Sequence, residues 1–158
     1  MRGFRAMQSF AAAGLALLAA SFLHTAVLAG EINTGYFGNV AIEGYDPVAY
    51  FTEGKAVKGK AEYAHDWLGA EWHFANADHL QRFIADPVAY SPQYGGMCAD
   101  GVAYGTMTVN IEPEVFSIID GKLYLAFDPG AKQEIEELPG QLEKAEANWP
   151  EVKARFQE

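Results

Sequence analysis

The chain has 158 residues, half of them hydrophobic, with 11 basic and 21 acidic side chains and a single cysteine. The apolar content excludes an intrinsically disordered protein, and one cysteine excludes an internal disulfide and the cysteine-rich zinc and iron–sulfur sites. The net charge of −10 argues against nucleic acid as a partner, because binding to phosphates needs a basic surface.

The first 29 residues have the pattern of a secretory signal peptide. Arg2 and Arg5 precede an apolar run over residues 10–22, and Val27 and Ala29 stand where a signal peptidase reads small or medium-sized side chains. Residues 10–29 also have the length of a membrane-spanning helix, so an uncleaved anchor is the alternative. We expect cleavage after Ala29, export to the periplasm or the cell exterior, and no stable membrane insertion afterwards. Residues 30–158 then form one domain of 129 residues with a net charge of −12.

Aromatic residues alternate with other residues on both sides of a glycine-containing connection in residues 62–75, which predicts a β-hairpin. If the turn is centred on Gly69, His65 and His73 stand directly opposite each other. Next, Asn76 has the side chain of a helix N-cap, and the apolar spacing that follows predicts a helix over residues 77–85. We expect His79, on the polar side of that helix, to be solvated.

The second half of the chain predicts one more hairpin and a helical tail. Residues 93–105 are rich in small side chains, which permits a helix or a glycine-rich loop, and we favour the helix. Asp120-Gly121 is a typical tight-turn pair between two short β segments. From about residue 128 to 158, amphipathic segments separated by Pro139-Gly140 and Trp149-Pro150 predict short helices. The predicted fold class is therefore α+β, with a small antiparallel sheet of two hairpins packed with short helices.

Three motifs resemble the YHS-domain proteins, specifically their small exported branch. They are Gly44-Tyr45-Asp46-Pro47-Val48-Ala49-Tyr50-Phe51, Trp72-His73-Phe74-Ala75 and Pro92-Gln93-Tyr94-Gly95-Gly96-Met97-Cys98-Ala99. The resemblance covers about residues 33–149 and implies a compact α+β domain that binds a metal such as copper. The cysteine-bearing relatives, however, have thiols where this chain has Ala49, Ala75 and His79. A soft copper(I) site built from those thiolates is therefore absent here.

The remaining candidate metal ligands are Cys98, Met97, His65 and His73. Two soft sulfurs suit copper(I), and imidazoles suit copper and zinc. The alternatives are a buried cysteine that behaves as a small hydrophobic residue and histidines that lie on the surface. A candidate ligand pocket comprises Tyr45, Asp46, Tyr94, Gly95 and Gly96, where aromatic rings adjoin small residues.

The sequence thus predicts a non-enzymatic exported protein that binds a copper or zinc ion or a small ligand. The first alternative is a module of the cell envelope that contacts another protein through its acidic and aromatic surface, with Cys98 buried and structural. A second alternative is a redox or transfer enzyme that uses the Cys98 thiol, for which a neighbouring base is required.

Overall fold

The computed structural model describes residues 31–156, so the predictions of a signal peptide or an anchor in residues 1–29 lie outside the described residues. The predicted fold class is confirmed: two antiparallel two-stranded sheets are packed with short helices. Between residues 31 and 156, no helix is both long and apolar enough to cross a membrane.

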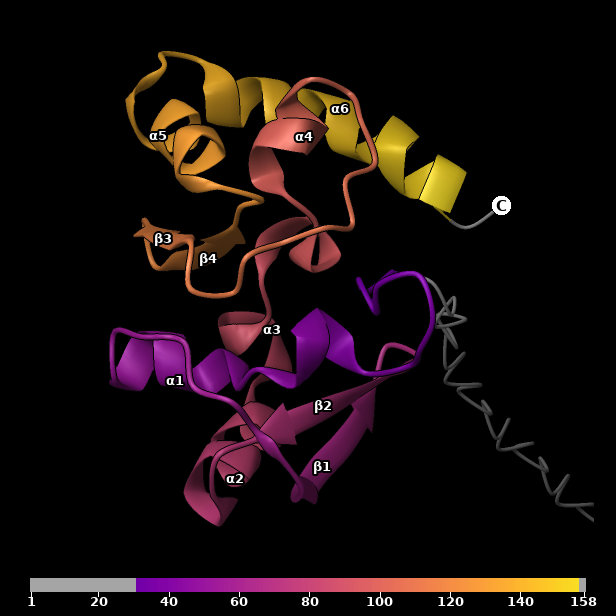
Figure 1. Cartoon of the computed structure of the whole chain (residues 1–158), viewed down its shortest axis with the longest axis vertical. Helices are drawn as coiled ribbons and strands as arrows, with labels where there is room; N and C mark the ends of the chain where they lie inside the picture. Colours follow the sequence, from indigo (N-terminus) through magenta and orange to yellow (C-terminus); the bar gives the residue numbers. More distant parts are fainter. Residues whose placement is uncertain (1–30, 157–158) are drawn as a thin grey trace, which may run out of the picture.

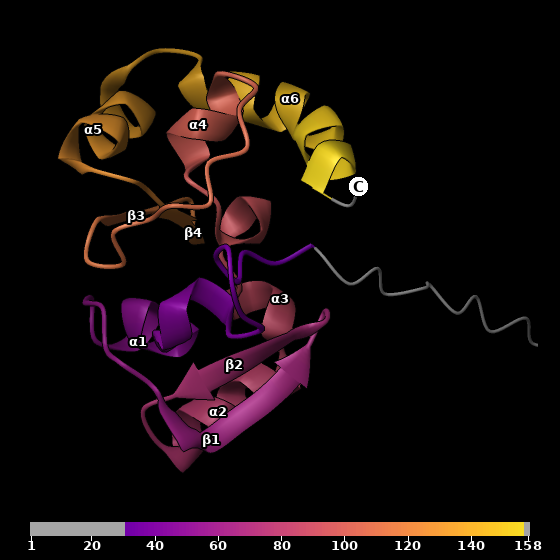
Figure 2. The ribbon, with the colours of Figure 1, turned by 45° about the vertical axis from the view of Figure 1, so that its right-hand side comes forward.

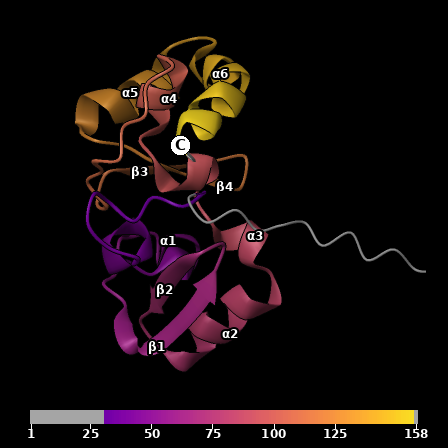
Figure 3. The ribbon, with the colours of Figure 1, turned by 90° about the vertical axis from the view of Figure 1, so that its right-hand side faces the viewer.

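The described chain forms two stacked halves (Figure 1). The lower half comprises the 3-10 turn η1 (Ala41–Gly44), helix α1 (Pro47–Thr52), strands β1 (Lys60–Trp67) and β2 (Ala70–Phe74), and helices α2 (Ala77–Ala85) and α3 (Pro87–Tyr90). Helix α2 packs beside the β1–β2 hairpin, and η1 lies along β2 (Figures 2 and 3). The core of this half is aromatic, with Trp72, Phe74 and Phe83 buried together.

The upper half begins with the 3-10 turn η2 (Gln93–Gly96) and helix α4 (Ala99–Ala103). Strands β3 (Phe116–Ile119) and β4 (Lys122–Leu125) follow, and helices α5 (Pro129–Glu137) and α6 (Gln141–Phe156) complete it. Its core joins Tyr94 and Met97 to α4 and to the inner face of α6. Strand β4 also contributes Leu123 and Leu125 to the lower core, so it connects the two halves.

The hairpin of residues 62–75 is confirmed, but its predicted register is wrong. Leu68 and Gly69 both have positive φ angles, 51° and 76°, and they form a two-residue turn. Trp67 therefore pairs with Ala70, and His65 pairs with Trp72. His73 pairs with Ala64 and points to the opposite face of the hairpin from His65. The two histidines do not stand across from each other, because Leu68 as well as Gly69 adopts the left-handed conformation. The turn therefore comprises both residues and is not centred on Gly69 alone.

Two other predicted elements are confirmed, and a third is confirmed only in part. Helix α2 spans the predicted residues, and the Asn76 side chain accepts a hydrogen bond from the His79 backbone N–H as an N-cap. The Asp120-Gly121 hairpin is confirmed in β3 and β4. In residues 93–105 only the second part is an α-helix, because Tyr94, Gly95 and Gly96 have positive φ angles that interrupt it.

The C-terminal tail differs from the prediction in one respect. Helix α6 continues through Pro150, where two separate helices were predicted. Proline removes one backbone hydrogen bond from a helix interior and crowds the preceding turn. Here Ala145, Trp149 and Val152 pack against the upper core on both sides of Pro150, and this packing keeps the helix continuous.

Asn33 joins the two halves through its backbone and side chain. Its backbone N–H donates to the Gly95 carbonyl at 2.8 Å, and its own carbonyl accepts from the Ile42 N–H at 3.0 Å. Its side-chain amide donates to the carbonyls of Gly96 at 3.0 Å and Val109 at 2.8 Å. Gly96 approaches Ile42 so closely that a Cβ at this position would lie 2.6 Å from the Ile42 side chain. The glycine and the buried amide together fix η1 against η2.

We predict that Asn33→Ala lowers the free energy of unfolding by about 2–3 kcal/mol, because two buried carbonyls lose their donor. Urea unfolding followed by tryptophan fluorescence measures the change. The matched control is Asn110→Ala, at an exposed asparagine, for which we expect a change within about 0.5 kcal/mol. Equal effects of the two substitutions would show that Asn33 does not join the halves.

We predict that Pro150→Ala raises the free energy of unfolding by about 1–3 kcal/mol, because alanine restores a backbone donor inside α6. Pro150 is exposed, so the substitution removes little packing. Glu151→Ala, at the next exposed position of the same helix, controls for the helix propensity of alanine. A Pro150→Ala protein that is no more stable than the Glu151→Ala protein would contradict this account of α6.

Candidate functional site

Cys98 lies on the wall of a cavity of about 350 Å³ between α4 and the start of α5. Its backbone N–H donates to the Thr108 carbonyl at 3.0 Å, and it forms a β-bridge with Leu125, so the backbone position of Cys98 is fixed from two sides. Only 2 % of the residue is exposed to solvent. The cysteine therefore belongs to the interior, and the cavity lies against it.

Three acidic residues contribute to the rest of the cavity wall. Asp100, Asp128 and Glu134 line it together with the half-exposed ring of Phe127. Each carboxylate accepts a single hydrogen bond from elsewhere in the fold: Asp100 from the Gln141 amide, Asp128 from the Ala131 backbone N–H, and Glu134 from the Tyr104 hydroxyl. A carboxylate has about four acceptor positions, so each of the three retains capacity to bind a ligand.

Burial raises the pKa of Asp100 above the usual range of an aspartate. The hydrogen bond from Gln141 opposes this shift, and the negative charges of Glu134 and Asp128 add to it. The three acidic groups of the cavity therefore repel one another in the unliganded protein. A positive charge placed among them would remove this repulsion.

Met97 lies apart from the cavity. It is fully buried in the upper core and does not line the cavity, whereas Cys98 does. The cavity therefore holds one of the two sulfur residues, and the pair of sulfur ligands stays a prediction.

The two candidate histidines lie on the β1–β2 hairpin in the lower half, whereas Cys98 precedes α4 in the upper half (Figure 1). The Nε2 of His73 lies 2.6 Å from a carboxylate oxygen of Glu71, and its ring lines a second cavity with Lys58 and Glu43. Within residues 31–156, no group of three or more His, Cys, Asp and Glu side chains is arranged to hold a metal ion. The proposed four-residue set of Cys98, Met97, His65 and His73 is not brought together.

The residues of the predicted aromatic pocket also lie in separate places in the fold. Tyr45 lies near the surface, where its hydroxyl donates to Glu114 at 2.9 Å and the Lys58 ammonium covers its ring. Tyr94 instead packs against Tyr124 and Trp149 in the upper core. Backbone and side-chain atoms of neighbouring segments lie directly against the Cα positions of Gly95 and Gly96. These glycines permit close packing and do not open a pocket.

Asp46, predicted as part of the ligand pocket, is fully buried and has a structural role. Its carboxylate caps α1 by accepting from the Val48 and Ala49 N–H groups. It also accepts from the Ala75 N–H at 2.8 Å and lies 2.6 Å from the Nδ1 of His79. His79 is only 7 % exposed, so the prediction of a solvated histidine is wrong. The polar side of α2 faces the α1 N-terminus at this position, which the helical spacing alone did not reveal.

We predict that Asp100→Asn stabilises the protein at neutral pH. Folding raises the pKa of the Asp100 carboxyl, so the folded protein holds this proton more tightly than the unfolded chain does. The free energy of unfolding therefore falls as the pH rises from below the pKa of the unfolded chain to above the pKa of the folded protein. Asparagine keeps an oxygen for the Gln141 amide but carries no charge. The melting temperature of Asp100→Asn should exceed that of the parent at about pH 7 and approach it at about pH 3.5. A difference of the same size at both pH values would contradict this assignment.

The chain matches no protein-family model, no curated protein and no solved structure. The resemblance to YHS-domain proteins therefore stays a prediction from the three short motifs.

Proposed function

We propose that this protein binds a small, positively charged ligand in the cavity that Cys98 shares with Asp100, Asp128 and Glu134, and that it does so without catalysing a reaction. The observation that carries the proposal is the gathering of three carboxylates around one cavity, where burial and mutual repulsion raise the pKa of Asp100. Such an arrangement costs stability in the free protein, and residues that cost stability are typical of binding sites.

The chemistry of the wall favours a cation. The carboxylates supply negative charge, and Phe127 adds an aromatic residue, the kind that attracts cations through its ring face. The Cys98 thiol adds one soft donor, which suits copper(I) or zinc better than a hard cation. Because the cavity donors do not converge on one point, a metal ion would keep water or another small ligand in its coordination shell. An organic diammonium ion fits the same separated carboxylates without that requirement.

The predicted export agrees with the same function, because a ligand-binding domain outside the cytoplasm meets ions and small molecules directly. The sequence of residues 1–29 carries the prediction of export. The resemblance to YHS-domain proteins, some of which have a proposed metal site, agrees with a cation as ligand.

A separate observation favours the interaction module as a second candidate. Tyr36 and Phe37 are adjacent, and their side chains are 71 % and 101 % exposed. Exposed aromatic pairs are enriched where proteins meet partners. This candidate leaves the acidic cavity and the raised pKa of Asp100 without a role, so we rank it second.

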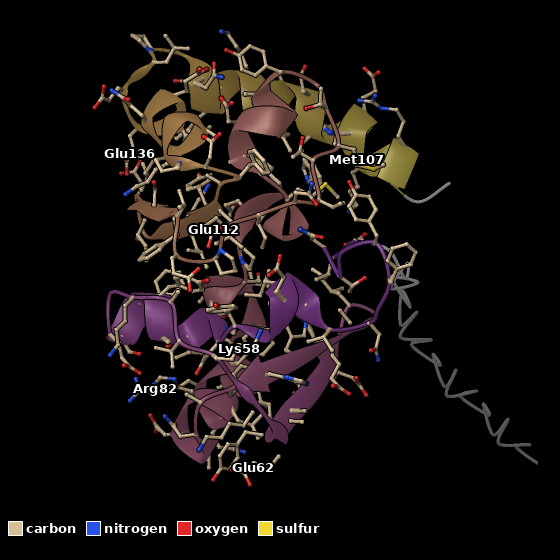
Figure 4. All side chains as sticks on the ribbon, viewed as in Figure 1. Lys58, Glu62, Arg82, Met107, Glu112 and Glu136 are labelled. Carbon is tan, nitrogen blue, oxygen red and sulfur yellow. The ribbon has the colours of Figure 1, made fainter. Side chains whose placement is uncertain are left out.

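Isothermal titration of the purified protein tests the proposal with zinc(II), copper(I) and 1,4-diaminobutane as probes. We expect at least one probe to bind stoichiometrically, and Glu134→Gln to weaken it by about tenfold or more, as the loss of a charged hydrogen bond would. Cys98→Ser should weaken the metals and leave the diamine unchanged. Glu62→Gln, on β1 at the far end of the molecule (Figure 4), is the matched control.

The proposal fails if none of the three probes binds. It also fails if Glu134→Gln and Glu62→Gln weaken binding equally, because binding would then reflect the overall negative charge. Either result would favour the interaction module.

A further inference from the structure

Three polar side chains outside the cavity form a series of hydrogen-bond contacts that runs from the interior of the lower half to its surface. Thr52 is exposed at the last position of α1. Its Oγ1 lies 3.3 Å from the Nε2 of His79, and the Nδ1 of the same ring lies 2.6 Å from the buried carboxylate of Asp46. A hydroxyl, an imidazole and a carboxylate in this order are the groups that activate a hydroxyl for nucleophilic attack.

The surroundings of Asp46 determine where the protons lie. The carboxylate is surrounded by donors, since it accepts from the N–H groups of Val48, Ala49 and Ala75. An ionised carboxylate only accepts hydrogen bonds, so the Nδ1 of His79 carries the proton that the contact requires. In the neutral ring the Nε2 then has a free electron pair, and that electron pair faces the Thr52 hydroxyl.

Thr52 has a second acceptor for the same proton, the Val48 carbonyl at 3.1 Å. A threonine hydroxyl that bonds the carbonyl four residues earlier is common in helices and has no chemical consequence by itself. What distinguishes Thr52 is that its hydroxyl oxygen lies within hydrogen-bonding distance of both this carbonyl and a ring nitrogen, in a residue that is exposed.

We propose that Thr52 is a nucleophile for acyl transfer, with His79 as its general base and Asp46 as the residue that positions the ring. In the reaction with an activated ester, the Oγ1 of Thr52 attacks the acyl carbon and its proton passes to the Nε2 of His79. The bond between the acyl carbon and the leaving oxygen breaks, and the leaving group receives its proton from His79 or departs as an anion. The products are an acyl ester on Thr52 and the free alcohol or phenol. This site does not depend on the acidic cavity beside Cys98.

The chain contains a matched comparison for this hydroxyl. Thr106 is also exposed, and its hydroxyl also donates to a nearby backbone carbonyl, that of Gly101 at 2.8 Å. Among residues 31–156, the other side-chain hydrogen bond of Thr106 is with the hydroxyl of Thr108, and no histidine nitrogen of these residues is hydrogen-bonded to it. Thr52 and Thr106 therefore differ mainly in the presence of the base.

The experiment treats the full chain with p-nitrophenyl acetate and follows acetylation of individual residues by peptide mass spectrometry. We expect Thr52 to be acetylated ~100-fold faster than Thr106, which is the usual contribution of a positioned general base. Thr52→Ser should keep rapid acetylation at position 52, because serine presents the same hydroxyl oxygen. His79→Gln should reduce the rate at Thr52 to that of Thr106. Equal rates at Thr52 and Thr106 in the parent protein would overturn the proposal.

A second measurement needs no substitution at a buried position. The nitrogen chemical shifts of His79 report which ring nitrogen carries the proton. In the neutral form of the ring we expect a protonated Nδ1 and a bare Nε2, which is a signature that a purely structural histidine does not require. An Nε2-protonated neutral ring would leave no base facing Thr52, and the proposal would be wrong.

Discussion

The carboxylate of Asp46 holds the lower half of the protein together. It is fully buried, and it accepts hydrogen bonds from the first turn of α1, from the end of β2 and from a histidine of α2. A buried charge is stable only when such donors surround it, so the positions of these elements are fixed by the need to satisfy one group. The exposed position of Thr52 beside His79 follows directly from this constraint.

The contact between the two halves depends on a second buried polar group, the Asn33 amide, together with the close approach of Gly96 to Ile42. The three motifs that resemble YHS-domain proteins contribute directly to these buried contacts: Asp46 belongs to the first, Ala75 to the second, and Gly95 and Gly96 to the third. The residues that carry the resemblance therefore build the scaffold. The acidic cavity is lined mostly by residues outside them, and among the motif residues only Cys98 reaches it.

The candidate sites were predictable to different degrees. Cys98 was identified because it is the single thiol, but the carboxylates around it come from α4, α5 and the loop before α5, and no local spacing joins them. The pairing of His65 with His73 depended on a turn of a given length, and the left-handed conformation of Leu68 changed the register. His79 and Thr52 were missed because their contact lies between two helices. The available signal in the sequence was a histidine in the first turn after an N-cap asparagine. An Asp-Pro pair elsewhere in the chain could have indicated a second helix start to which that histidine bonds.

By itself, the sequence determined the α+β class, both hairpins and the extent of α2, because turn residues, caps and hydrophobic periodicity act over a few neighbouring positions. Only the tertiary structure decided which side chains meet. Packing against the upper core kept α6 continuous through Pro150, and it brought acidic residues from separate helices around Cys98. It also brought the Thr52 hydroxyl, the His79 ring and the Asp46 carboxylate into one series of contacts, although the three residues are separate in the sequence. Such contacts depend on how whole helices and strands pack against one another. That packing is set by all the side chains of the core together and not by neighbouring positions in the sequence.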